Sequence, residues 1–473
     1  MPDATRLVVI GAGPGGYTAA FHAADLGMRV TLVDESPRLG GVCLQRGCIP
    51  SKALLHAAGV IGDARRAARW GVAFGAPAID LDRLRGWKDE VVSALTGGLG
   101  RLAQQRAVTF LQGRAAFADR HKVMVEPAGG GEPLGVPFDY AIVATGSRPV
   151  RPATLALDDP RVMDSTGALE IARASGSLLV VGGGYIGLEL GAVYAALGCT
   201  VTVVEMTAGL LPGVDADLVR VVARQMDREL DGVRLRTKVA VLRPRPDGIE
   251  ALLEGPDGQS EARLFDQVLV AVGRSPNSRI AGLERTAVEL DGRGFIVVDA
   301  HRRTAEPSIF AIGDVAGEPM LAHKAFHEAR AAVETIAGRP AAFEPLAVPA
   351  VVFTDPEVAW CGLTETRAAG EGRAVKVSRF PWGASGRALT LDRPEGITKL
   401  VVDPDSEQLL GVGMAGAGAG ELIAEGVLAV EMGATVSDLR LSIHPHPTLS
   451  ETVAEAADLF FGECTHLYRP KRS

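Results

Sequence analysis

The chain has 473 residues and a net charge of −8, with 47% hydrophobic and 22% charged residues. This length predicts roughly three domains, and the acidic balance argues against a nucleic-acid partner. The short basic block at residues 469–472 is expected to be a solvated terminus. All apolar runs are too short for a membrane span. Five cysteines are too few for a secreted disulfide scaffold, so we expect a cytoplasmic protein.

The first predicted elements form a strand–turn–helix–strand unit of the kind that binds dinucleotides. Apolar residues 6–10 predict a strand, residues 17–26 a helix, and residues 29–33 a second strand that ends at Asp34. The turn before the helix carries the pattern G-x-G-x-x-G at Gly11, Gly13 and Gly16. Such glycines let backbone amides approach a pyrophosphate at the positive end of the helix. The acidic residue can then accept hydrogen bonds from a ribose diol.

Two cysteines, Cys43 and Cys48, follow this unit and are separated by four residues. Pro50 suits the first turn of a helix that runs on to His56. Cys48 is therefore expected near a helix N-terminus, where the dipole lowers the pKa of a thiol. We interpret the pair as redox-active. A zinc site lacks a second ligand pair at metal spacing, and a structural disulfide closing so short a loop would stabilise little. Both are the weaker alternatives.

The same dinucleotide-binding unit occurs a second time. Residues 178–181 predict a strand, and residues 199–204 predict another that ends at Glu205. Between them the glycine pattern recurs at Gly182, Gly184 and Gly187. The first glycine and the acid are 23 residues apart in both copies, which predicts two dinucleotide sites. Because a carboxylate repels a 2′-phosphate, Glu205 favours NAD over NADP, although it could also serve only to end the strand.

A third pattern suggests a flavin site. Residues 304–314 predict an apolar strand that delivers Asp314, whose carboxylate suits the hydroxyls of a ribityl chain. Residues 320–332 predict a helix whose N-terminus could face the pyrimidine end of the flavin and stabilise its anionic reduced form. Two similar turns, residues 144–149 and 271–276, are interpreted as the points where the chain leaves and re-enters the flavin domain.

Near the C-terminus, His446 and Glu451 form a candidate proton acceptor. Thiol–disulfide exchange needs a base so that an incoming dithiol can attack as a thiolate, and a histidine held by a carboxylate serves near neutral pH. The competing interpretation is a capping box, Thr448-x-x-Glu451, that opens a helix over residues 452–460. The residues themselves leave these two interpretations equally weighted.

These motifs together resemble the dihydrolipoamide dehydrogenase family. The similarity covers the segment Gly40–Leu55 around the cysteines, the C-terminal signature His446–Glu451, and shorter stretches at residues 87–90, 95–99 and 349–365. The resemblance implies that Cys43 exchanges with dihydrolipoamide and that Cys48 contacts the flavin. It also implies that His446 is the general base, with Glu451 orienting it, and that this pair reaches the cysteines of the other subunit.

The resemblance further implies an α/β fold with two Rossmann-like domains and a C-terminal α+β interface domain. FAD would be bound by residues 1–149 with 275–347, NAD by 150–274, and dimerisation would use 348–473. Beyond the first glycine turn, Asp34 and Asp314, the residues expected to contact FAD are Lys52, Ala115, Thr145, Gly146, Ser147, Met320, Leu321, Ala322 and His323. Beyond the second turn and Glu205, those expected to contact NAD are Glu189 and Gly273, and Lys52 would pair with Glu189.

The implied activity is oxidation of protein-bound dihydrolipoamide by NAD through the cysteine pair and FAD. The implied partners are a second copy of the chain, lipoyl domains of E2 or the glycine-cleavage H protein, and the peripheral subunit-binding domain of E2. The chain departs from the family at Val42, where Thr is common, and at Gln45-Arg46, where Asn is frequent at the first position. Tyr185 could cover a nicotinamide pocket or simply pack. The alternatives are a related reductase of another disulfide and a non-catalytic flavin redox sensor.

Overall fold

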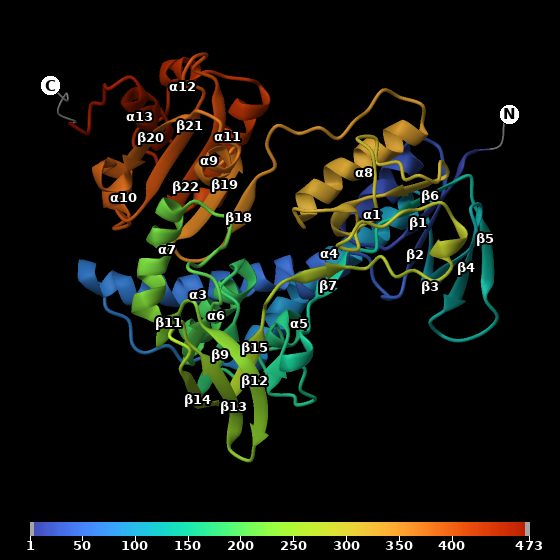
Figure 1. The fold of residues 1–473 in the computed structure, drawn as a ribbon, viewed down its shortest axis with the longest axis horizontal. Helices are drawn as coiled ribbons and strands as arrows, with labels where there is room; N and C mark the ends of the chain where they lie inside the picture. The colour runs from blue at the N-terminus through green and yellow to red at the C-terminus, as the bar shows by residue number, and fades with distance from the viewer. Residues whose placement is uncertain (1–3, 469–473) are drawn as a thin grey trace.

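The computed structural model describes residues 4–468, and the basic block at 469–472 lies outside them. The chain folds around three main sheets, two of them with a parallel core (Figure 1). The first two sheets are built from the N-terminal three-quarters of the chain. The third is built from the C-terminal residues, drawn in orange and red.

The first sheet begins with β1, whose residues after Arg6 are all buried, as expected for a strand covered on both faces. It pairs in parallel with β2, with Leu7 opposite Val30. Helices α1 (Pro14–Asp25) and α8 (Ala322–Ile336) pack together on this sheet through small buried side chains. The strand order is β17 (Ile309–Ala311), β6 (Tyr140–Val143), β1 (Arg6–Ile10), β2 (Arg29–Asp34), β3 (Thr109–Asp119), β4 (Lys122–Pro127), β5 (Leu134–Pro137).

The second sheet repeats this arrangement with five parallel strands. Helix α6 (Tyr185–Leu197) follows β9 as α1 follows β1, and it is buried on most of its surface. The strand order is β11 (Gly232–Arg234), β10 (Thr200–Val204), β9 (Ser177–Val181), β15 (Gln267–Val270), β8 (Val162–Met163). An antiparallel sheet adjoins it, made of β12 (Lys238–Arg245), β13 (Gly248–Glu254) and β14 (Ser260–Phe265).

Two short antiparallel strands join these two parts. Strand β7 (Ser147–Pro149) pairs with β16 (Arg274–Pro276), with Ser275 opposite Arg148. These strands belong to the two turns that the sequence suggested as crossing points. The chain therefore enters and leaves the second part at one place.

The C-terminal sheet is entirely antiparallel. Trp382 and Phe380 are fully buried on it, and α11 (Ala419–Glu431) and α13 (Glu451–Phe460) pack against it. Its order is β18 (Ala350–Val352), β19 (Glu357–Gly362), β22 (Leu409–Gly416), β21 (Ile397–Val402), β20 (Lys376–Pro381). The smaller helices here are α9 (Glu365–Gly370), α10 (Gly386–Thr390) and α12 (Val436–Leu441).

Helices from the first part connect to the other two. Helix α2 (Gly41–Arg46) leads directly into α3 (Cys48–Ala67), which packs against α4 (Leu81–Gln105) and against α6. The remaining helices of the second part are α5 (Ser165–Ala168) and α7 (Ala216–Glu229), and α7 contacts the C-terminal sheet. Figure 1 shows α7 standing between the two parts.

A buried group of charges fixes this last contact. The Nζ atom of Lys399, which is 1% exposed, lies 2.6 Å from Asp215 and 2.8 Å from Asp217. Both acids flank the start of α7, whereas Lys399 belongs to β21. Burying an ammonium group is costly unless it is paired in this way. The group therefore ties the second part of the chain to the C-terminal sheet.

Several element boundaries differ from the sequence predictions. Helix α1 begins three residues earlier than expected, because Pro14 can occupy a first helical turn. The strand expected over residues 304–314 is confined to Ile309–Ala311, with turns before it and the 3-10 helix Gly313–Ala316, which contains Asp314, after it. Helix α8 begins at Ala322 and extends four residues further than predicted.

Candidate active site

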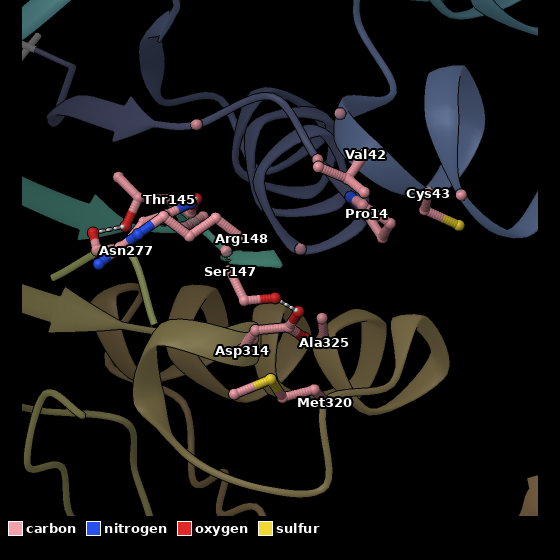
Figure 2. A pocket seen from close by; sticks show the side chains of 18 of the residues that line it. Pro14, Val42, Cys43, Thr145, Ser147, Arg148, Asn277, Asp314, Met320 and Ala325 are labelled. Atoms are coloured by element: carbon pink, nitrogen blue, oxygen red, sulfur yellow. Dashed lines mark hydrogen bonds between the residues drawn. The ribbon is translucent and has the colours of Figure 1, made fainter. Parts of the chain in front are cut away.

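The turns that follow β1 and β6 meet α2, α3 and α8 around a cavity of about 640 Å³. This volume is in the range of small-molecule and cofactor sites. Figure 2 shows Val42 and Cys43 on one side of the cavity, and Asp314 and Met320 on another. The lining residues predicted from the sequence are Gly11, Gly13, Asp34, Cys43, Cys48, Lys52, Ala115, Thr145, Gly146, Ser147, Glu189, Asp314, Met320 and Ala322.

The first glycine turn contains two kinds of glycine. At Gly11, φ is +104° and an added Cβ would lie 2.3 Å from the carbonyl oxygen of Ala144, and at Gly16 it would lie 1.7 Å from that of Gly11. The fold itself requires glycine at both positions. At Gly13, by contrast, the nearest atom to an added Cβ is 4.0 Å away. Glycine at this position instead leaves room for a ligand, which fits a pyrophosphate lying against the backbone amides.

The second glycine turn has the same construction. An added Cβ would lie 2.4 Å from the Ala271 oxygen at Gly182, and 2.1 Å from the Gly182 oxygen at Gly187. Within the described residues, nothing lies within 4 Å of a Cβ added at Gly184. The middle glycine of each turn is thus the one that the protein alone does not need. The two turns fit two dinucleotides.

The acids Asp34 and Glu205 also occupy equivalent positions. Asp34 accepts the amide of Ala12 at 2.6 Å and that of Ser36 at 2.8 Å. Glu205 accepts the amides of Gly183 at 2.7 Å and Thr207 at 2.8 Å. Each acid therefore ties its glycine turn to the end of the second strand. For Glu205, a role at the end of the strand was the competing interpretation. Such a role does not exclude ribose binding, because each carboxylate oxygen can accept more than one hydrogen bond.

Cys43 lies in α2 and Cys48 at the first position of α3, and each thiol shifts the pKa of the other. The hydrogen bond from Cys43 and the charge of Lys52 lower the pKa of Cys48 to about 7, against the effect of burial. The same hydrogen bond, together with burial, raises the pKa of Cys43. Cys48 is therefore the thiol of the reduced pair that ionises first, and its place at a helix N-terminus also favours its thiolate.

Lys52 and Glu189 form an ion pair beside these thiols. The Nζ atom of Lys52 lies 2.8 Å from Oε2 of Glu189, whose side chain is 4% exposed. Lys52 lies one turn after Cys48 on α3, and Glu189 comes from α6 of the second part. The pair expected from the family resemblance is thus present, and it places a positive charge near both thiols.

Asp314 is held by a chain of hydrogen bonds that begins in the crossing strands. The hydroxyl of Ser147 donates to Oδ2 of Asp314 at 2.5 Å, as Figure 2 shows. The guanidinium group of Arg274 donates to the hydroxyl and to the carbonyl oxygen of Ser147, both at 2.7 Å. The hydroxyl of Thr145 donates to the carbonyl oxygen of Asn277 at 2.8 Å, which closes the crossing. No sequence motif indicated a role for Arg274 or Asn277.

The residues before α8 divide into two groups. Met320 and Ala322 line the cavity, whereas Leu321 and His323 are not among its lining residues. His323 points away from it, and its Nε2 lies 2.7 Å from the carbonyl oxygen of Pro349. Burial lowers the pKa of His323, which favours the neutral imidazole. The side-chain direction at a helix start could not be read from the sequence.

His446 and Glu451 lie together at the C-terminal end of the chain. Nδ1 of His446 lies 2.8 Å from Oε1 of Glu451, while Oε2 of Glu451 accepts the amide of Thr448 at 2.8 Å. Although partial burial opposes it, these hydrogen bonds hold the pKa of Glu451 below its usual range. One half of the expected capping box is therefore present, and the same carboxylate also orients the histidine.

His446 is 74% exposed, and it is not among the residues that line the cavity with the cysteines. Within residues 4–468 of a single chain, the histidine is therefore exposed and does not lie in the cavity that contains the two thiols. Tyr185 does line the cavity, and desolvation raises its pKa to about 12. Gly273, with φ +126°, precedes Arg274 in the crossing, outside that lining.

With this geometry established, comparisons with known proteins decide the family. The model described as pyridine nucleotide-disulphide oxidoreductase matches residues 5–329. The chain belongs to this family. The model of the family's dimerisation domain matches residues 348–457, which supports assembly of this oxidoreductase as a homodimer.

Similar proteins span the whole chain. A dihydrolipoyl dehydrogenase of Vibrio parahaemolyticus is 46% identical and one of Thermus scotoductus is 45% identical, each covering 98% of both chains. Among solved structures, LpdA from Mycobacterium tuberculosis has a TM-score of 0.88 at 26% identity and covers 96% of this chain and 99% of its own. The HOCl-induced flavoprotein disulfide reductase RclA from Escherichia coli has a TM-score of 0.84 at 27% identity, with the same coverage.

Membership of this oxidoreductase family makes the chain an enzyme that uses FAD and NAD. The space beside Gly13 and Gly184 fits these two dinucleotides. Within residues 4–468, every helix is too short or too polar to cross a membrane.

Proposed function

We propose that this oxidoreductase is a dihydrolipoyl dehydrogenase, which oxidises protein-bound dihydrolipoyl groups with NAD. The observation that carries the proposal is the 45–46% identity to proteins of that name over 98% of both chains. Its site geometry agrees, because a thiol pair with one depressed pKa lies beside an ion pair in a cavity that fits a flavin.

The chain's own residues account for the thiol steps. A substrate thiolate attacks the Cys43 sulfur of a Cys43–Cys48 disulfide, and Cys48 leaves as a thiolate, which Lys52 stabilises. The second substrate thiol then displaces Cys43, which releases the substrate as a disulfide and leaves the cysteine pair reduced. Bound FAD supplies the electron chemistry that connects the reduced pair to NAD. The remaining acids and glycines bind and orient the two dinucleotides.

His446 is proposed as the base that takes the proton from each substrate thiol. Its side chain is largely exposed, while Glu451 holds its Nδ1. Because the histidine points away from the cavity in its own chain, we propose that it serves the cysteines of a second copy. The chemistry then requires the homodimer.

Further assignments extend this proposal. FAD would be bound by residues 1–149 with 275–347 and NAD by 150–274, with 348–473 at the dimer interface. Lipoyl domains of E2 or the glycine-cleavage H protein would deliver the substrate, and the peripheral subunit-binding domain of E2 would anchor the dimer. A cytoplasmic location is proposed because five cysteines are too few for a secreted disulfide scaffold.

The decisive experiment is an anaerobic titration of the purified protein with dihydrolipoamide and, separately, with NADH, followed by absorbance. Both should reduce the protein and give a long-wavelength thiolate–flavin band, and Cys48→Ser should abolish that band. A protein that NADH reduces but dihydrolipoamide does not would refute the substrate and leave the family intact.

The base is tested by timing the two half-reactions separately. His446→Gln should slow reduction by dihydrolipoamide by roughly 100-fold or more, which is the usual contribution of a general base, while reduction by NADH stays near the wild-type rate. Equal slowing of both half-reactions would contradict the role of His446.

A further inference from the structure

Phe353 brings the C-terminal sheet into contact with the redox centre. It directly follows β18, and its backbone amide donates to Oε1 of Glu189 at 3.0 Å. Its ring lies under the ammonium group of Lys52, 4.5 Å from Nζ to the ring centroid. One residue of the C-terminal part thus touches both members of the Lys52–Glu189 pair.

These contacts restrain the position of a flexible charge. Lysine has four rotatable bonds, and the Lys52 side chain is 32% exposed, so one carboxylate does not fix the ammonium group. Glu189 attracts it from one side and the face of the Phe353 ring from another, by a cation–π interaction. The Glu189 carboxylate is itself fixed, because it is buried and accepts the Phe353 amide.

The position of that charge matters to Cys48. After the hydrogen bond from Cys43, the charge of Lys52 is the main influence that lowers the pKa of Cys48, whereas Glu189 raises it. These two effects oppose each other, so their balance depends on where the ammonium group stands between the carboxylate and the thiol. A small displacement toward Glu189 or into solvent weakens the effect on the thiol.

We propose that Phe353 is a positioning residue for the redox pair, through which docking of the C-terminal part controls the thiolate at Cys48 by way of Lys52. The proposal rests on the proposed redox role of Cys48, which it deepens. Its consequence is that the C-terminal part acts on the thiols of its own chain, in addition to any residue it presents to a second copy.

The test compares Phe353→Leu with Phe353→Tyr, both in a Cys43→Ser background of the FAD-loaded protein. Leucine keeps the apolar volume and the backbone amide but removes the ring, whereas tyrosine keeps the ring. The readout is the pH titration of thiolate ultraviolet absorbance between about pH 5 and 9, where only one thiol ionises. The other thiols stay protonated because burial raises their pKa values to about 11 or 12, at Cys199, Cys361 and Cys464.

The leucine variant should raise the pKa of Cys48 by about half a unit, in line with the loss of one partly exposed cation–π contact, and the tyrosine variant should not. In a Lys52→Met background the leucine substitution should have no further effect. FAD content and melting temperature verify folding, and Phe353→Met replaces the leucine variant if that one does not fold.

An unchanged pKa in a folded leucine variant would overturn the proposal, and so would a shift that persists without Lys52. The thiol titration does not depend on which dithiol the enzyme oxidises. A negative result in the dihydrolipoamide titration, which would refute the proposed substrate, is therefore distinguishable from a negative result in the thiol titration, which would refute the role of Phe353.

Discussion

Replacing Gly184 with alanine should weaken NAD binding while leaving the fold intact. The backbone there has φ −78° and ψ 176°, which alanine adopts without strain. Within the described residues, no atom lies within 4 Å of the added Cβ. Alanine is a poorer helix cap than glycine, which destabilises the fold, but it also restricts the unfolded chain, which stabilises the fold. Because these two effects roughly cancel, the free energy of unfolding should change by less than about 1 kcal/mol.

The added methyl group would occupy the space that the pyrophosphate needs beside the helix N-terminus. Losing one charge-assisted amide hydrogen bond costs about 1.5–3 kcal/mol, which raises the Kd for NADH by roughly 10- to 150-fold. Titration of NADH fluorescence measures this Kd, and flavin absorbance should show an unchanged FAD content. A folded Gly184→Ala protein that binds NADH as tightly as wild type would refute the reasoning.

Gly187→Ala is the matched control from the same turn. Its Cβ would lie 2.1 Å from the carbonyl oxygen of Gly182, so the turn must distort. This variant should lose both NADH affinity and thermal stability, whereas Gly184→Ala should lose affinity alone. Similar melting temperatures for the two variants would show that the close contact does not constrain the turn.

Two more predictions concern the buried charges at α7. Lys399→Met should lower the free energy of unfolding by about 3–5 kcal/mol in urea, because Asp215 keeps a buried charge without its partner; a loss under 1 kcal/mol would contradict this. Although burial opposes it, the hydrogen bonds from Lys399 and Thr366 lower the pKa of Asp215. A depressed folded pKa contributes stability that is present above the ordinary value of 3.8 and is lost as the pH falls below it. Melting temperatures should therefore fall less steeply in acid for Asp215→Asn than for wild type, and parallel curves would contradict that role.

The features that the sequence predicted are those that depend on local spacing. Both strand–turn–helix units were expected, and β1, β9 and their glycine turns occur where the pattern put them. The equal distance to Asp34 and Glu205 corresponds to a real equivalence, since each acid accepts the amide of the residue after the first glycine of its own turn, Ala12 or Gly183. Local spacing succeeds here because one short segment contains all the interacting groups.

The features that were missed join segments far apart in the chain. The contacts of Phe353 with Lys52 and Glu189 join all three parts of the chain, and Lys399 meets Asp215 across the boundary of two. The contact of the His323 side chain with the carbonyl oxygen of Pro349 likewise joins two distant segments. No periodicity or motif encodes such contacts, because they arise from the way separately folded parts pack together.

The two amides bound by Glu205 have a consequence for changing the nucleotide. Exchanging NAD for NADP would ordinarily begin by removing this carboxylate, to admit a 2′-phosphate. Here the removal would also leave the amides of Gly183, which is buried, and of Thr207 without their acceptor. The residue expected to select the nucleotide is also part of the turn's framework, so a change of specificity would need a replacement acceptor for those amides. A substitution of Glu205 that admits NADP would therefore also destabilise the turn.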